Sequence, residues 1–381
     1  MTGRLVYSEE LTRYDFGHDH AMGPGRVRHT IELAEQLGVL DLLEIVPPPP
    51  IDDDLILAVH DRDYVDAVKA NVENLAYGLG STDNPIFSQM HEVSATIAMA
   101  TAEAARGVWA GEVRRACNIS GGLHHAMPRA TSGFCIYNDV AVAISWLLAN
   151  GAERIAYVDV DVHHGDGVQQ IFYNEPRVLT VSLHETPAVL FPGTGFPYEI
   201  GGPDAIGSAV NVALPAGTGD SGWLRAFHAV VPQALRAFQP QILITQHGCD
   251  SHQHDPLADL ELTVDGQRAS YLALADLADE LCEGRWVSTG GGGYSITNVV
   301  PRAWTHLLAI IAGQPLSPQT ATPEKWRQEL GVGYVPLAMT DGVEVNYIDW
   351  DRGFSPTSRL DQAVLATRKA VFPELGLDPG I

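Results

Sequence analysis

Five short apolar runs, each ending in small or polar residues, constrain the fold of this chain more than any other feature. They occupy residues 114–122, 154–161, 177–184, 241–248 and 285–294. Between them lie segments with helical periodicity, such as 139–151 and 220–238. Continuous β-branched runs that alternate with helices are typical of a mostly parallel sheet covered by helices on both faces. The sequence therefore predicts an α/β fold.

The length of 381 residues allows one large domain or two ordinary ones. Two proline-rich stretches are candidate linkers. We interpret residues 46–52 (VPPPPID) as the connection from an N-terminal helix to the next element, and residues 313–326 as a change of composition near the end. Beyond them, Ser358 can cap a last amphipathic helix. We predict a single domain over residues 1–381, with 315–381 as a C-terminal tail that packs on it.

The charge balance limits the partners of the chain. It has 23 basic and 47 acidic residues, a net charge of −24. Such a field repels phosphate backbones, so we expect no direct binding to nucleic acid. The field favours cationic partners, including lysine-rich protein segments, unless it serves solubility alone.

Other features bear on the location of the protein. No apolar run approaches the ~20 residues of a membrane helix. Residues 1–10 lack a signal-peptide pattern, and the four cysteines form no CxxC pair. We therefore expect a cytoplasmic protein with reduced thiols and no membrane contact. The sequence leaves the oligomeric state open.

Chemically active side chains follow four of the apolar runs. In parallel sheets, ligands gather beyond the carboxyl ends of the strands. The residues found there are Gly121, Gly122, His124 and His125; Asp159, Asp161, His163, His164 and Asp166; His247, Asp250, His252 and His254; and the glycines of GGGGY before Tyr294.

The Asp-x-His pair after residue 160 predicts one wall of a metal site. Alternation along an extended chain would put Asp159, Asp161 and His163 on one side. With Asp250 from another strand end, Asp161 and His163 supply three N/O ligands and leave a position open, as in a catalytic zinc site. Two carboxylates neutralise a divalent ion that can polarise a carbonyl and activate water. Taken alone, an Asp-x-His pair is as well explained by a hydrogen-bonded loop.

The tandem His124-His125 predicts acid–base chemistry beside this site. One imidazole can act as general base and the other as an electrostatic or acid partner, each oriented by an aspartate such as Asp159 or Asp166. Tyr294 can donate a hydrogen bond to an oxyanion, although a glycine run by itself indicates only a tight turn. Phosphate-loop, serine-elbow and HExxH motifs are absent from the sequence, which argues against phosphoryl transfer, serine hydrolases and zincins.

Taken together, these residues resemble the zinc-dependent histone deacetylase family, in its class I-like branch of the arginase–deacetylase superfamily. The resemblance runs from residue 14 to residue 304, with order and spacing preserved. Its motifs are SGGLHHA, SGFCIYND, DVDVHHGDGVQ, VSLHETPAVLFPGTG, NVALPAGTGD, HGCDSHQHDPL and GGGGY. YGLGSTDNPIF and the ATRKAVFP segment resemble the bacterial acetoin-utilisation (AcuC-type) members in particular.

The resemblance implies a role for each site residue. The implied zinc ligands, with iron as an alternative metal, are Asp161, His163 and Asp250. The implied catalytic residues are His125 as base or acid, His124 as its electrostatic partner, Asp159 and Asp166 as their orienting carboxylates, and Tyr294 as oxyanion donor. The implied substrate-binding residues are Phe134, Phe191 and Gly292, with Asp83 at the rim and Arg26 on an internal channel. The implied potassium site consists of Asp159, Asp161, His163, Ser182 and Leu183, and a second site is expected near Phe172 and Val178.

Some positions depart from the family pattern. Leu123 and Leu190 replace aromatic residues, and Gly23 and Gly25 replace larger ones in the entrance loop. These changes bear on substrate preference and leave the chemistry intact.

The implied activity is hydrolysis of acetyl-lysine in proteins. An acetylpolyamine or another small amide is the alternative substrate. A dimanganese arginase-like enzyme would need carboxylates where this chain has Gly165 and His252. A non-catalytic acyl-lysine reader would be expected to have lost a ligand, the base or the tyrosine, and all of these are present.

Overall fold

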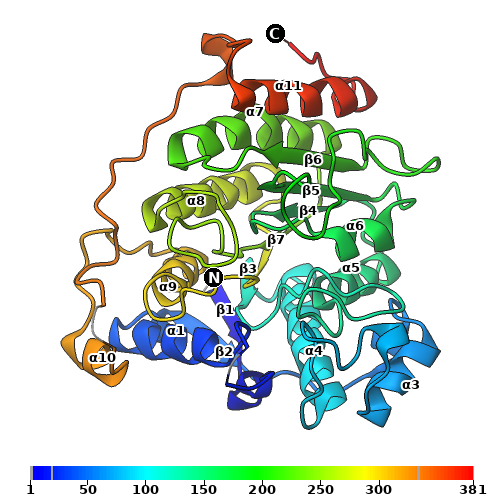
Figure 1. Ribbon diagram of the computed structural model, residues 1–381, viewed down its shortest axis with the longest axis vertical. Helices are drawn as coiled ribbons and strands as arrows, with labels where there is room; N and C mark the ends of the chain where they lie inside the picture. Colours follow the sequence, from blue (N-terminus) through cyan, green and yellow to red (C-terminus); the bar gives the residue numbers. More distant parts are fainter. Residues whose placement is uncertain (1–2, 19, 333–334, 381) are drawn as a thin grey trace.

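The computed structural model describes residues 3–18, 20–332 and 335–380 and contains an eight-stranded sheet in which every pairing is parallel (Figure 1). The strand order is β2-β1-β3-β8-β7-β4-β5-β6. The strands are β1 (Gly3–Val6), β2 (Leu43–Val46), β3 (Arg115–Asn118), β4 (Ile155–Asp159), β5 (Val178–Glu185), β6 (Ala209–Leu214), β7 (Ile242–Gln246) and β8 (Trp286–Thr289). The predicted α/β class is confirmed.

Helices cover both faces of the sheet. The first layer consists of α1 (Gly25–Gln36), α7 (Asp220–Phe238), α8 (Val264–Leu281) and α9 (Val300–Ile311). The second layer consists of the long helices α4 (Met90–Trp109) and α5 (Asp139–Ala149) and the shorter α2 (Asp53–Leu57), α3 (Arg62–Ala70) and α6 (Asp166–Phe172). Successive strand residues enter opposite cores: Val158 packs in the first layer and Tyr157 in the second. This double burial explains why the strands have continuous apolar sequences.

Three strands were not predicted from the sequence: β1, β2 and β6. The strand β2 lies at an edge of the sheet, and its Glu44 and Ile45 are exposed, so it lacks the apolar run of a central strand. It also corrects the interpretation of residues 46–52, because the prolines follow a strand rather than a helix. Prolines suit this position, since they cannot extend a hydrogen-bonded ladder.

The strand order places four catalytic loops side by side. Strands β3, β8, β7 and β4 are consecutive neighbours in the middle of the sheet. Their last residues are level: Asn118 pairs with Thr289, Thr289 with Gln246, and Gln246 with Asp159. The loops that follow these strands therefore leave the same edge of the sheet at the same height.

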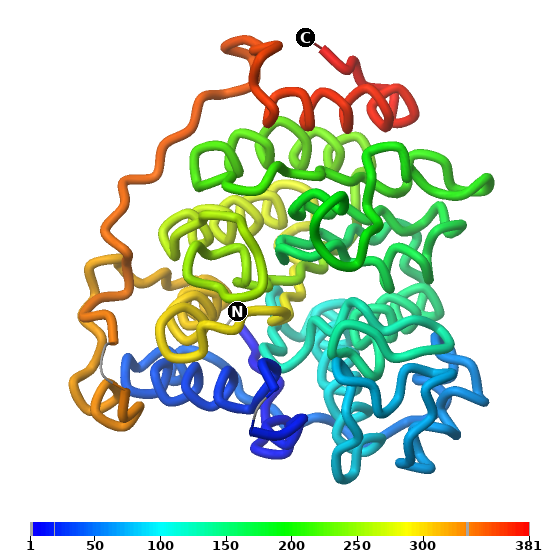
Figure 2. The backbone as a smooth tube through the Cα atoms, in the orientation of Figure 1, coloured from blue at the N-terminus to red at the C-terminus, as the bar shows by residue number. Residues whose placement is uncertain are grey.

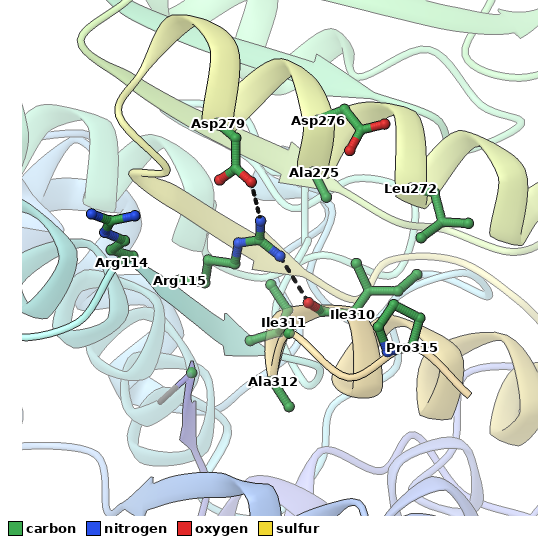
Figure 3. A pocket seen from close by; sticks show the side chains of 12 residues that line it. Arg114, Arg115, Leu272, Ala275, Asp276, Asp279, Ile310, Ile311, Ala312 and Pro315 are labelled. Atoms are coloured by element: carbon green, nitrogen blue, oxygen red, sulfur yellow. Dashed lines mark hydrogen bonds and ion pairs between the residues drawn. The ribbon is translucent and has the colours of Figure 1, made fainter. Parts of the chain in front are cut away.

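A pocket of about 580 Å³ opens at the opposite, amino-terminal edge, where β1 and β3 begin (Figure 3). Arg115 crosses it and donates hydrogen bonds to Asp279 of α8, at 2.8 Å, and to the carbonyl of Ile310 in α9, at 2.9 Å. These bonds join the ends of two helices to a strand. We assign this pocket a structural role, because the histidines and aspartates at the strand ends lie at the other edge.

The tail contains α10 (Glu324–Glu329) and α11 (Arg359–Val371), and the segment between them follows one side of the molecule (Figure 2). Helix α10 packs on α1, and α11 packs on α7 and β6. Ser358 caps α11, as predicted, by accepting a hydrogen bond from the Asp361 N–H. The buried Arg225 of α7 donates to both carboxylate oxygens of Asp361, at 2.8 and 3.0 Å, and to carbonyls of residues 348, 349 and 353. We infer that residues 315–381 belong to the same folding unit. No helix among the described residues is long and apolar enough to cross a membrane.

Replacing Arg225 tests this unit. Arg225→Ala leaves Asp361 buried without its partner, so the free energy of unfolding should fall by about 3–5 kcal/mol in denaturant titrations. The control is Arg236→Ala on the same helix, whose exposed pair with Glu280 contributes about 0–1 kcal/mol. Equal losses in the two variants would show that the tail is not part of the cooperative unit.

Candidate active site

Asp161, His163 and Asp250 form a buried group with the arrangement of metal ligands. One donor atom of each lies within 4.8 Å of the others. The Nδ1 atom of His163 is 3.2 Å from Asp161 Oδ1 and 3.1 Å from Asp250 Oδ2. Burial and the neighbouring charge of Asp161 raise the pKa of Asp250. Two buried carboxylates facing one imidazole suit a divalent cation, which would neutralise both.

The chain reaches this geometry through turns and not through an extended strand. Strand β4 ends at Asp159, so the predicted alternation over residues 159–163 is wrong beyond that residue. Instead, Asp159 Oδ1 accepts the Asp161 N–H at 3.1 Å, and Asp161 Oδ1 accepts the His163 N–H at 3.0 Å. These two turns direct Asp159 toward His124 and Asp161 toward the ligand group.

The two tandem histidines lie beside the ligand group, each backed by a carboxylate. His124 Nδ1 is 2.7 Å from Asp159 Oδ2, and His125 Nδ1 is 2.6 Å from Asp166 Oδ1. Their Nε2 atoms lie 3.0 Å apart. A hydrogen bond between two imidazole nitrogens needs one proton between them, so one ring donates and the other offers a lone pair.

The charges around His124 and His125 give the two rings different protonation states. Burial opposes charge on His124, but the carboxylates of Asp159 and Asp161 outweigh it and raise the pKa of His124 to about 9. Burial and the charge of His124 lower the pKa of His125 to about 4. At neutral pH, His124 is therefore the charged ring and His125 the neutral one.

Gly292 and Gln246 fix the position of Asp161. Asp161 Oδ2 accepts the Gly292 N–H at 2.8 Å and the Gln246 side-chain amide at 2.7 Å. A Cβ at residue 292 would lie 2.0 Å from Asp250 Oδ2, so only glycine fits. Gly292, predicted to bind substrate, thus lies against the ligand carboxylates. Gln246 was not predicted from the sequence, although its position at the end of a central strand could have indicated a role in the site.

Tyr294 joins the ligand group to the entrance. It lines two adjoining pockets together with His125 and His163. Its backbone N–H donates to Asp255 Oδ2 at 2.7 Å, a contact that was not predicted from the sequence. Burial, reinforced by the charge of Asp250, raises the pKa of Tyr294 well above its ordinary value, so the hydroxyl remains a donor.

The outer pocket, of about 240 Å³, has the composition of a channel for an apolar stem. Its aromatic and aliphatic lining is Phe134, Phe191, Leu190, Leu257 and Tyr294, and Asp83 is its acidic residue. Phe134 meets Tyr294 edge-on with ring centres 5.8 Å apart, and Phe191 meets His125 in the same way at 5.0 Å. His20, from the entrance loop, contacts Phe134 and lies 3.1 Å from the Asp83 carbonyl.

The remaining predicted residues occupy the surroundings of the site. Arg26 lies buried behind the glycine run and donates to the carbonyls of Gly291 and Gly293, at 2.6 and 3.3 Å. Ser182 on β5 is paired in register with Asp159 on β4, with Leu183 next to it. His164, for which no role was predicted, is held by Thr194 and Gln169 at 2.9 and 3.1 Å.

Comparison with known proteins identifies the class that this geometry defines. Residues 20–311 match the histone deacetylase domain. The chain therefore belongs to the histone deacetylase family, and it is a hydrolase with a site that fits a metal-dependent deacetylase.

Individual relatives support the assignment to this family. The chain is 38% identical to the acetoin utilization protein AcuC of Bacillus subtilis, over 84% of each chain. It is 36% identical to that of Staphylococcus xylosus, over 92% of this chain and 94% of the relative. Its structure matches that of an HDAC homolog from Aquifex aeolicus with a TM-score of 0.83 and 26% identity, covering 97% of this chain and 100% of the other.

The position of Gly292 can be tested directly. In Gly292→Ala, the new methyl group would push the carboxylate of Asp250 out of place. We expect zinc affinity, measured by chelator competition, to fall at least ~10–100-fold, as for lost outer contacts at metal sites. Gly23→Ala is the control, because a Cβ there meets nothing within 4 Å. Wild-type affinity in Gly292→Ala would contradict the ligand assignment.

Proposed function

We propose that this hydrolase removes acetyl groups from the ε-amine of lysine in proteins or peptides, with zinc held by Asp161, His163 and Asp250. One observation carries the proposal: two carboxylate-backed imidazoles and the three ligand residues meet at the base of an aromatic-lined pocket. Iron is the alternative metal. When bound, the ion would supply Lewis-acid chemistry, polarising the amide carbonyl and lowering the pKa of a water molecule.

The side chains of the site move the protons. His125, neutral because of its low pKa, accepts a proton from the attacking water at Nε2, once this nitrogen is released from its contact with His124. Asp166 holds the ring and stabilises the charge that it gains. His124 remains protonated and adds positive charge beside the developing oxyanion. A histidine of the pair then protonates the departing lysine amine.

Tyr294 supplies the oxyanion contact in this proposal. Its hydroxyl is protonated, and Tyr294 lines the same pocket as His125 and His163. Donors that are in place before the reaction stabilise a developing oxyanion without reorganisation. Arg26 supports this placement, because it binds the carbonyls on either side of residue 292 and lies 5.8 Å from the Tyr294 ring centre. We retain an internal channel beside Arg26 as part of the proposal.

A potassium ion would bind beside the proposed zinc site. We assign it to Asp159, Asp161, His163, Ser182 and Leu183, largely through backbone oxygens. The pairing of Asp159 with Ser182 on neighbouring strands supports this assignment, because it brings carbonyls of both strands to one level. A second cation site is proposed where α6 ends at Phe172 and β5 begins at Val178.

The shape of the entrance favours a lysine side chain over a polyamine. A lysine stem is an apolar (CH₂)₄ chain that aromatic faces can enclose. Phe134 and Phe191 line the outer pocket, and Asp83 can accept hydrogen bonds from the substrate backbone. An acetylpolyamine carries a cationic chain, which a pocket with a single acidic residue would bind less well. By the same argument the expected partners are acetylated proteins.

Removing the tyrosine hydroxyl tests the oxyanion role. Tyr294→Phe should lower kcat on an acetyl-lysine peptide by ~10²–10³-fold, as expected for one oxyanion donor. Tyr198→Phe, at a site that is 71% exposed, is the matched control and should retain full rate. Chelation should abolish activity in both proteins, and zinc should restore it. Full activity in Tyr294→Phe, or activity indifferent to chelator, would overturn the mechanism.

Substrate size and Asp83 together test the substrate class. We expect an acetyl-lysine peptide to be cleaved with a higher kcat/KM than acetylputrescine. Asp83→Asn should raise KM for the peptide about 10-fold, the effect of one charged hydrogen bond. The exposed Asp204→Asn serves as control. A preference for acetylputrescine would replace the protein substrate with a polyamine.

A further inference from the structure

The loop from Asp250 to Asp255 is anchored by a residue that the mechanism does not use. His252 is fully buried, between the ligand Asp250 and Asp255, which binds the backbone of Tyr294. Its Nδ1 accepts the His254 N–H at 3.0 Å, so its proton resides on Nε2. Nε2 therefore donates, and its acceptor, at 2.8 Å, is Asp341 Oδ2 of the tail.

Asp341, which is half-buried, is the centre of a network that joins buried groups. The same Oδ2 accepts the Val264 N–H at the start of α8 at 2.8 Å, and Oδ1 accepts from Arg302 of α9 at 2.7 Å. Arg302 is fully buried, and its other donors bind Asn298 and the carbonyls of residues 338 and 340. One carboxylate thus links the tail, two helices and the loop after β7.

The tail segment at this point is itself fixed. Thr340 Oγ1 donates to both oxygens of Asp265 at 2.6 and 2.8 Å, and the N–H groups of Asp341 and Val343 bind the same carboxylate. Asp265 lies in the first turn of α8, where negative charge is favoured. Asp341 is therefore held on a helix end and cannot follow the loop if the loop shifts.

We propose that Asp341, acting through His252, is a positioning residue for the ligand Asp250 and for Tyr294. This inference rests on the proposed metal site. Asp341 lies outside residues 20–311, the range that matches the family domain, so the tail would help to position the residues of the site. The Asp255 N–H donates to the His252 carbonyl at 2.8 Å, and Asp250 lies two residues before His252, so a shift of His252 reaches both aspartates.

The contact between His252 and Asp341 also bears on whether the site could hold a second metal ion. A two-metal ureohydrolase would need a carboxylate where this chain has His252. Here the side chain at that position binds the tail and not the ligand group. The replacement of a carboxylate by histidine thus removes a metal ligand and creates an anchor.

The test compares two tail carboxylates, the half-buried Asp341 and the buried Asp361, each paired with a buried arginine. In Asp341→Asn, the amide offers one acceptor oxygen in place of two, so an NH₂ donor faces either Arg302 or the pair of His252 and Val264, and the anchor of the loop is weakened in both cases. In Asp361→Asn, the pair with Arg225 is weakened far from the loop. Zinc affinity of the full chain, measured by chelator competition, should fall ~10–100-fold in Asp341→Asn, the usual effect of losing an outer-shell partner. It should stay within about 3-fold of wild type in Asp361→Asn, although both variants unfold at lower denaturant concentration.

Two further variants separate the possible failures. His252→Leu removes the same hydrogen bond from the loop side and carries the test if Asp341→Asn does not fold; His252→Gln retains a donor and should bind zinc more tightly than His252→Leu. Wild-type zinc affinity in Asp341→Asn or in His252→Leu would reduce the network to a structural role. Wild-type affinity in Asp250→Ala would overturn the proposed metal site itself, and the positioning role with it.

Discussion

The site depends on the level register of four neighbouring parallel strands. Because β3, β8, β7 and β4 end at the same height, the loops that follow them meet without long excursions. Each loop contributes one part: the histidine pair after β3, the glycine run and Tyr294 after β8, Asp250 after β7, and Asp161 with His163 after β4. A shift of any one strand by a residue would separate groups that are now about 3 Å apart.

Buried charge is the second organising constraint. Unpaired carboxylates are unfavourable in a dry interior, so buried aspartates need partners. In this protein the partners have different consequences. Asp159 and Asp166 pair with the imidazoles of two histidines whose pKa values differ. Asp341 and Asp361 pair with the guanidinium groups of Arg302 and Arg225, and these pairs anchor the tail. The carboxylates of Asp161 and Asp250 share one imidazole, which is why this pair in particular suits a metal ion.

The sequence predicted five of the eight strands and the helices over residues 139–151, 220–238 and after Ser358, because buried strands leave continuous apolar runs and amphipathic helices have a 3.6-residue period. It missed β1 and β6 as well as β2, an edge strand with two exposed side chains, and it extended β4 beyond Asp159. The three candidate ligands, the histidine pair and Tyr294 were predicted from their positions at strand ends, whereas Asp83, Phe134, Phe191 and Arg26 followed from the family resemblance. Asp255 and Asp341 were missed, because their importance lies in contacts with distant residues and no local pattern marks them. Gln246 was missed although it ends a central strand.

The sequence by itself determined the α/β class, the groups at the strand ends and the kind of chemistry they can perform, because these follow from local periodicity and side-chain type. Only the tertiary structure decided which strands are neighbours, how closely the two histidines approach each other and where His252 points. These are long-range choices. They are set by how strands separated by tens of residues pair in the sheet, and by how helices and the tail pack around it.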